Sequence, residues 1–177
     1  QQLSAGADVI IGQAAATTND ANHGGAALGL NGPFSVSLWN GALYVADTSN
    51  HRVLIWNQLP KPGAGQKGAD LVLGQTDLTQ VSANGGMAAP TGATMRGPMG
   101  IYHDDLRLYV ADSGNHRVLI FREPITTSGQ AAEIVLGQGS PTTGGSNAVK
   151  ANTLGTPIGI AVQGERLPEA VLKMSGL

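Results

Sequence analysis

The sequence predicts an all-β fold made of four-stranded antiparallel units, and three observations support this fold class. Gly accounts for 26 of the 177 residues and is scattered with Pro, Thr, Ser and Asn between short apolar runs, a composition typical of many strands joined by turns. A long segment is repeated within the chain. A second, shorter segment recurs beside it at nearly equal spacing, which indicates a repeat architecture.

The longer repeat aligns residues 32–56 with residues 97–121 without a gap. The shorter segment is apolar and ends in Gly-Gln, and it occurs at 7–13, 69–75 and 132–138. An apolar residue also stands three positions before the Pro that opens each unit, and we expect it to pack one unit on the next. These apolar residues are Leu30, Met95 and Leu154.

Each complete unit contains four short apolar runs, which indicates a four-stranded antiparallel sheet, or blade. Asn40-Gly41 is a strong hairpin signal between the first two runs of the first unit. The expected strands are 34–38, 42–47, 51–56 and 70–74 in the first unit, and 99–103, 107–112, 116–121 and 133–137 in the second.

The repeat pattern is incomplete at both ends. An outer strand is expected at 8–12 with no inner strands before it, and an inner strand at 158–162 with no outer strand after it. The segment 167–174 lacks the repeat motif and has mild helical character. We therefore divide the single segment 1–177 into an outer strand at 8–13, complete blades at 32–75 and 97–138, and a partial, irregular blade at 157–177.

Composition excludes several functional classes. Charged residues make up 12% of the chain and the net charge is −2, so nothing supplies the basic field that nucleic-acid binding requires. The absence of Cys excludes disulfides, thiol catalysis and thiolate metal sites. No apolar stretch approaches the roughly 20 residues of a membrane-spanning helix. Gln1 fits both a mature secreted protein and a fragment, and we expect a periplasmic or extracellular location.

The most specific pattern is Tyr-Val-Ala-Asp-Thr-Ser-Asn-His-Arg-Val at 44–53 and its counterpart Tyr-Val-Ala-Asp-Ser-Gly-Asn-His-Arg-Val at 109–118. These segments resemble the hallmark of NHL repeats, and the added Val-Leu-Gly-Gln strand resembles the long-repeat bacterial members. The resemblance extends to about residue 163. It implies a β-propeller that serves as a protein-binding or RNA-binding platform and, in some members, as a lyase.

The motif residues are expected to be structural. Asp and Asn side chains can bond to backbone amides in a tight turn, and an Arg fork can reach a carboxylate or neighbouring carbonyl groups. We expect the two Asp carboxylates to accept such bonds, and replacement of Asp47 by Ala to cost about 1–3 kcal/mol. The structural set is Asp47, Asn50, Arg52, Asp112, Asn115 and Arg117.

Two histidines, His51 and His116, suggest a metal site because successive blades could direct imidazoles to a central axis. Local packing is the preferred interpretation, so no metal or cofactor is predicted, and both residues remain candidate binding residues. His103-Asp104-Asp105 is interpreted as a solvated turn.

Long loops are the expected binding elements. In an antiparallel meander, the loops 14–31, 76–96 and 139–156 share one end of the blades with the motif turns, and loops on a rigid scaffold commonly carry binding. The most polar cluster is Asn19, Asp20, Asn22 and His23, although an exposed flexible loop would look the same.

No nucleophile motif, phosphate loop or dinucleotide fingerprint occurs, so no catalytic residue is predicted. The favoured function is a non-catalytic scaffold that binds a protein or a glycan. The alternatives are a metal-dependent lyase or hydrolase and a structural assembly module. About three blades are too few for a closed ring, so we expect part of a longer propeller or one half of a homo-oligomeric one.

Overall fold

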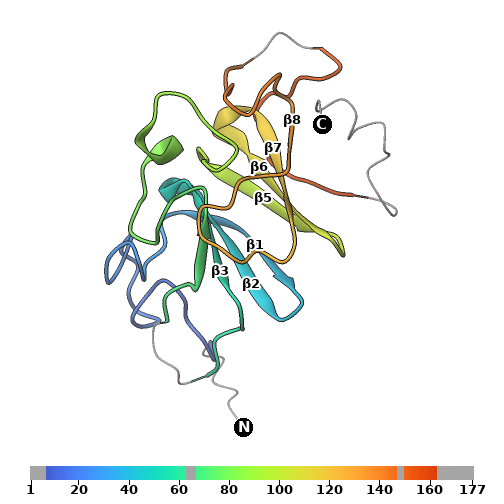
Figure 1. Ribbon diagram of the computed structural model, residues 1–177. Helices are drawn as coiled ribbons and strands as arrows, with labels where there is room; N and C mark the ends of the chain where they lie inside the picture. Colours follow the sequence, from blue (N-terminus) through green and yellow to red (C-terminus); the bar gives the residue numbers. More distant parts are fainter. Residues whose placement is uncertain (1–6, 63–66, 147–149, 163–177) are drawn as a thin grey trace.

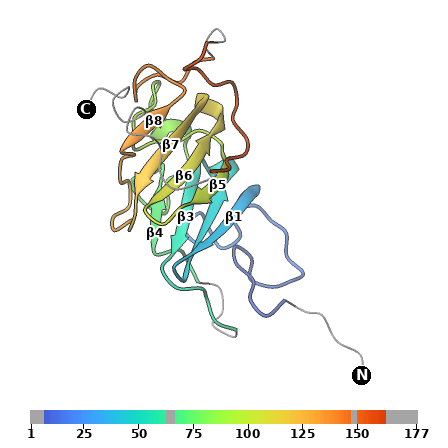
Figure 2. The ribbon, with the colours of Figure 1, turned by 90° about the vertical axis from the view of Figure 1, so that its right-hand side faces the viewer.

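Two four-stranded antiparallel sheets dominate the computed structural model, which describes residues 7–62, 67–146 and 150–162. The described residues contain almost no helix, and the all-β fold class is confirmed. Figures 1 and 2 show the two sheets packed beside each other, with long loops at one end. No helix in the described ranges is long and apolar enough to cross a membrane.

The eight strands of the two complete units follow the predicted order, and each of their predicted boundaries is met within one residue. Each sheet is a simple meander in which neighbouring strands along the chain are hydrogen-bonded. The first sheet contains β1 (Pro33–Trp39), β2 (Ala42–Asp47), β3 (Arg52–Trp56) and β4 (Leu71–Leu73). The second contains β5 (Pro98–His103), β6 (Arg107–Asp112), β7 (Arg117–Arg122) and β8 (Ile134–Leu136).

The hairpin between β1 and β2 has the turn chemistry that its sequence predicts. Asn40 and Gly41 have φ values of 47° and 81°. Positive φ at both central residues is what a type I′ turn requires, and Asn and Gly adopt it at the least cost. Trp39 and Ala42 therefore face each other as the last pair of the ladder.

The main core lies between the two sheets because the middle strands bury both of their faces. All six residues of β2 are buried. Tyr44 and Val53 point toward the second sheet and pack with Val110 and Leu119, whereas Leu43 and Val45 belong to a separate cluster on the opposite face of the first sheet. The middle strands of the first sheet are therefore covered by the second sheet on one face and by Ile11, Leu30 and Leu78 on the other.

The apolar residues expected to pack one unit on the next each lie against a Gly of the shorter repeat. A Cβ atom added to Gly74, where φ is +89°, would lie 2.9 Å from Met95 Cγ and 2.9 Å from the His51 carbonyl oxygen. Leu30 lies in the same way against Gly12, and Leu154 against Gly137. Glycine is needed here because both the space and the backbone conformation exclude a side chain.

The strands predicted at 8–12 and 158–162 are absent. Gly12 forms an isolated bridge to Gly29, and residues 158–162 belong to no ladder. A strand needs hydrogen bonds from a neighbouring strand, and the described residues place none beside either segment. Both segments nonetheless pack on sheet faces, through Ile11 on the first sheet and Ile160 and Val162 on the second. The rest of the irregular blade, 163–177, lies outside the described residues.

Candidate functional site

Both motif turns form one turn of 3-10 helix, η1 (Thr48–Asn50) and η3 (Ser113–Asn115), followed by a His in the left-handed conformation. Asp47 precedes η1 and is completely buried. Its carboxylate accepts hydrogen bonds from Asn31 N–H at 2.6 Å, Asn50 Nδ2 at 2.8 Å and Arg52 Nε at 2.7 Å. The carboxylate therefore ties the turn to both the preceding loop and the following strand.

The second turn repeats this arrangement. Asp112 accepts hydrogen bonds from Arg96 N–H at 2.7 Å, Asn115 Nδ2 at 2.8 Å and Arg117 Nε at 2.7 Å. Burial raises the pKa of the Asp112 carboxyl above its ordinary value, while Arg117 and the other donors act in the opposite direction. The two carboxylates have the hydrogen bonds expected for them.

Each motif Arg also connects two of the long loops. Arg52 Nη1 donates to the carbonyl of Leu78 at 2.6 Å, and Nη2 donates to the carbonyls of Ala26 and Gly29 at 2.6 and 3.2 Å. The loops 14–31 and 76–96 are thus held by one guanidinium group. The planar fork of donors makes this possible, because it satisfies several acceptors at once.

Arg117 does the same for the next pair of loops, 76–96 and 139–156. Its Nη2 donates to the carbonyls of Thr91 and Thr94, and its Nη1 donates to the carbonyl of Pro141. The three long loops therefore meet at one end of the sheets, around the motif turns.

Among the polar loop residues singled out from the sequence, Asn22 lies apart from the others. Its amide pairs with that of Asn50, with Asn50 Nδ2 donating to Asn22 Oδ1 at 2.6 Å. Asn84 pairs with Asn115 in the same way at 2.8 Å. Both loop residues have φ of 54°. Asn22 thus belongs to the hydrogen-bond network of the motif. The sequence signal for this role is that Asn84 occupies the matching position in the next loop.

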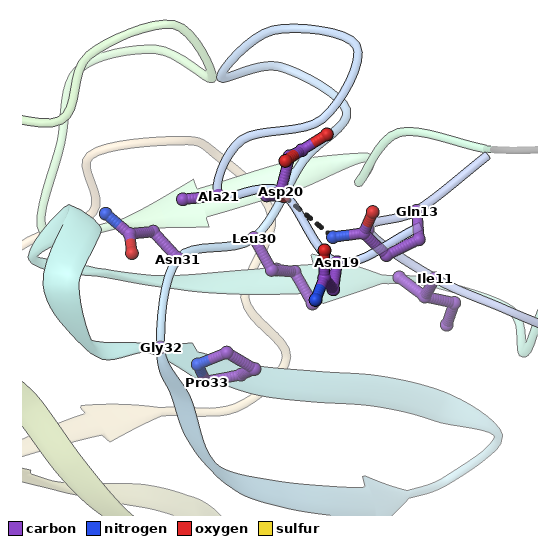
Figure 3. A pocket seen from close by; sticks show the side chains of 10 residues that line it. Ile11, Gln13, Asn19, Asp20, Ala21, Leu30, Asn31, Gly32 and Pro33 are labelled. Carbon is purple, nitrogen blue, oxygen red and sulfur yellow. Dashed lines mark hydrogen bonds between the residues drawn. The ribbon is translucent and has the colours of Figure 1, made fainter. Parts of the chain in front are cut away.

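The remaining loop residues lie at the surface. Asp20 is exposed, and its carboxylate is 3.8 Å from Nδ1 of His23. Asn19 and Asp20 lie at the edge of a hollow of about 290 Å³, and Gln13 Nε2 donates to the Asp20 carbonyl there (Figure 3). Ile11, Gly12 and the stretch 30–33 form the rest of this hollow.

A larger hollow of about 420 Å³ is formed mainly by the loop 76–96. No charged side chain lines it. Oε1 of Gln75 is buried and has no hydrogen-bond partner among the described residues, whereas Gln80 and Met87 are exposed. The lining consists of Gln75, Thr76, Gln80, Gly85, Met87, Thr91, Ala93, Thr94 and Gly129.

The NHL repeat family model matches residues 30–56 and 96–121. This chain contains two NHL repeats. The matches cover the three inner strands of each blade and both motif turns, and the long loops and fourth strands lie outside them. NHL repeats suggest a β-propeller scaffold for protein interaction. A comparison with curated proteins finds no match.

The two NHL-repeat histidines connect each blade to the segment that follows it. His51 Nδ1 accepts a hydrogen bond from Gly97 N–H at 3.0 Å, and His116 Nδ1 accepts one from Thr156 N–H at 3.0 Å. In this arrangement Nδ1 is unprotonated, because it acts as an acceptor. In the described part of the chain, no group of three or more His, Asp or Glu side chains could hold a metal ion.

The bond from Gly97 predicts a loss of stability in mild acid. Burial, followed by the charge of Arg96, lowers the pKa of His51 below its ordinary value of 6.5. The unfolded chain therefore binds a proton more readily, so the stabilisation is fully present above about pH 6.5 and declines as the pH falls below it. We expect His51→Asn, which suits positive φ and cannot titrate, to reduce the change in unfolding free energy between pH 7.5 and 5.5. An unchanged pH dependence would contradict this role.

One buried polar cluster between the NHL blades was missed from the sequence. His103, interpreted as part of a solvated turn, has only 4% of its side chain exposed. Its Nδ1 is 3.0 Å from Ser37 Oγ, and its Nε2 is 3.4 Å from Oε1 of Glu123. Its ring also contacts Trp39 and Tyr44. The solvated-turn interpretation is wrong for His103, because the side chain of this residue faces the first blade.

Asp104 lies in the predicted turn and is partly exposed. Its carboxylate accepts bonds from the backbone N–H groups of Leu106 and Arg107 and from Tyr109 Oη at 2.7 Å. Burial and this bond raise the pKa of Tyr109 to about 12. Asp105, in contrast, is exposed as expected.

Proposed function

We propose that this NHL-repeat chain is a non-catalytic interaction scaffold whose loop face binds a neutral, polar partner, namely an uncharged protein segment or a glycan. The observation that carries the proposal is the hollow of about 420 Å³ in the loop 76–96. It offers polar and apolar groups but no charge. Gln80 and Met87 are exposed in this hollow and could contact such a partner.

Rigidity of the loop face supports the proposal. Arg52 and Arg117 bind carbonyl groups of successive loops, and Asn84 is held by Asn115. Loops fixed in this way lose little conformational entropy when a partner binds, so more of the contact energy appears as affinity. A scaffold that presents fixed loops is therefore a better match to the geometry than a flexible recognition segment.

The alternative of a metal-dependent lyase or hydrolase has less support. Asp47 and Asp112 are already engaged by Arg side chains, and Nδ1 of His51 and of His116 accepts a backbone hydrogen bond. Catalytic use of these groups would require breaking bonds that hold the blades together. We further propose a periplasmic or extracellular location, with neither nucleic acid nor membrane insertion involved in binding.

Binding can be tested by NMR titration with neutral oligosaccharides and with uncharged peptides rich in Ser, Thr and Asn. A bound ligand should shift the amides that line the larger hollow. Met87, which is 48% exposed, lines this hollow. Met87→Glu places an unpaired carboxylate there and should weaken binding at least about tenfold, because desolvating a charge is costly.

Leu59→Glu provides a matched control, because Leu59 is 51% exposed and its backbone N–H bonds to Gly41 at the hairpin end of the first blade. This variant should bind as the parent chain does. Equal weakening by both substitutions would reject the loop face as the site. Salt-sensitive, submicromolar binding of single-stranded RNA would reject a neutral partner.

A further inference from the structure

The larger hollow of the loop face is bounded by both NHL blades. The end of the first blade and the loop 76–96 supply most of its wall, and Gly129 comes from the connection between β7 and β8. Gly129 N–H donates to the Val72 carbonyl at 2.9 Å, and Ser128 Oγ accepts a hydrogen bond from Val72 N–H at 3.2 Å. The wall from the second blade is therefore fastened to β4, and the hollow belongs to the joint between the blades.

The hydroxyl groups in the wall are already engaged within the loop. Thr94 Oγ1 accepts a hydrogen bond from Thr91 N–H at 2.8 Å, and Thr91 Oγ1 accepts one from Ala93 N–H at 3.2 Å. Thr76 Oγ1 donates to the Asp77 carboxylate at 3.4 Å. The three lining threonines therefore hold the loop together with their hydroxyls, which leaves fewer polar groups for a ligand.

Apolar groups form most of the remaining wall. Met87 is 48% exposed, and Ala93 is half-buried beside it in the lining. The Thr94 methyl group faces Gly85, because a Cβ atom added to Gly85 would lie 3.6 Å from Thr94 Cγ2. Among the described residues that line the hollow, none is aromatic or charged. Met is unbranched and has a polarizable thioether, so the wall at Met87 can adapt to the shape of an apolar group.

This lining suits an aliphatic side chain better than a sugar. A sugar ring carries hydroxyl groups around its rim, and each one that leaves water needs a hydrogen-bond partner. An aliphatic side chain needs only apolar contact, and its removal from water is favourable in proportion to the area buried. The volume of about 420 Å³ lies within the roughly 300–1,000 Å³ of small-ligand sites.

On the basis of the loop-face function proposed above, we propose that the larger hollow binds a protein partner through one aliphatic side chain of the size of Leu or Met. This side chain inserts between Met87 and the methyl groups of the lining threonines. The residues that flank it in the partner are uncharged and polar, and they lie against the exposed Thr76 and Gln80. A charged residue would lose its hydration in the hollow without gaining a counter-charge.

The proposal can be tested with capped peptides of the sequence Ser-Thr-Xaa-Ser-Asn, in which Xaa is Leu or Ala, and with the neutral sugars maltotriose and chitotriose. NMR titration of the full chain follows the lining amides of Gly85, Met87, Ala93 and Gly129. The Leu peptide should shift these amides and bind at least about tenfold more tightly than the Ala peptide, because it buries more apolar surface.

The outcomes separate the aliphatic side chain from the wider loop-face function. Equal affinity of the Leu and Ala peptides would overturn the aliphatic side chain and leave a protein-binding loop face in place. Shifts of the lining amides by a sugar alone would also overturn it, in favour of a glycan partner. If no probe shifts these amides, the aliphatic side chain and the loop-face function are both wrong.

Two substitutions of Met87 test the apolar contact. Met87→Leu keeps an apolar side chain, whereas Met87→Gln keeps the length and introduces an amide. The Leu peptide should bind to Met87→Leu within about threefold of the parent affinity, and to Met87→Gln at least about tenfold more weakly. A sugar site would gain hydrogen-bonding groups from Gln, so unchanged or stronger binding to Met87→Gln would overturn the proposal.

Oxidation provides a measurement that needs no substitution. Hydrogen peroxide transfers one oxygen atom to the Met87 sulfur, which is oxidised to the sulfoxide while the peroxide is reduced to water. Saturating Leu peptide should slow this reaction several-fold, as measured by mass spectrometry of proteolytic fragments. Met95 is completely buried and serves as the internal reference for the fold. An unchanged oxidation rate of Met87 in the presence of bound Leu peptide would overturn the proposal.

Discussion

Replacement of Asp47 by Ala is expected to lower the free energy of unfolding by about 3–5 kcal/mol. Arg52 is completely buried and its Nε is 2.7 Å from the Asp47 carboxylate. Removal of the carboxylate leaves a buried guanidinium without its counter-charge and leaves Asn31 N–H without its acceptor. This cost exceeds the 1–3 kcal/mol expected from the sequence, which counted the backbone donors and not a fully buried ion pair.

Denaturant unfolding followed by circular dichroism measures this loss. Asp77→Ala is the matched control, because Asp77 is exposed and accepts bonds only from its own turn, at Thr76 and Thr79. It should leave the denaturant concentration at the unfolding midpoint nearly unchanged, because bonds of an exposed carboxylate are screened by solvent. A loss of less than about 1 kcal/mol in Asp47→Ala would show that the motif carboxylate does not hold the turn.

Replacement of Glu123 by Ala is expected to cost about 2–4 kcal/mol. Its side chain is 1% exposed and faces His103 Nε2 at 3.4 Å, its carboxylate accepts a hydrogen bond from Ile125 N–H at 2.8 Å, and its charge acts on the Tyr44 hydroxyl. Burial, followed by the Glu123 charge, raises the pKa of Tyr44. Without the carboxylate, two buried polar groups at the interface between the blades lose their partner, and a cavity remains.

Glu133→Ala is the control for this prediction, since Glu133 is exposed and lies 3.9 Å from Arg107 Nε. Its replacement should cost less than about 1 kcal/mol. Glu123→Gln, which keeps the shape and one acceptor, should fall between the two. If Glu123→Ala unfolds at the same denaturant concentration as Glu133→Ala, the cluster contributes nothing to the joint.

The strands and motif turns were predictable because their signals are local. Alternating burial, the Asn40-Gly41 hairpin and the repeated Asp-to-Arg turn are all contained within a few consecutive residues. The segment 8–12 has the same apolar pattern as 70–74, yet it forms no strand. A pattern indicates that a segment suits a sheet, but a neighbouring strand has to supply the hydrogen bonds.

The sequence by itself determined the all-β fold, the two NHL blades and the residues of their turns, since repetition of a pattern reveals the unit. The tertiary structure alone decided what lies between the units. His103 contacts Ser37 at a separation of 66 residues, and His51 bonds to Gly97 at a separation of 46. Such contacts depend on how one sheet packs against the next. The local sequence around each of these residues does not indicate which distant residue it will contact.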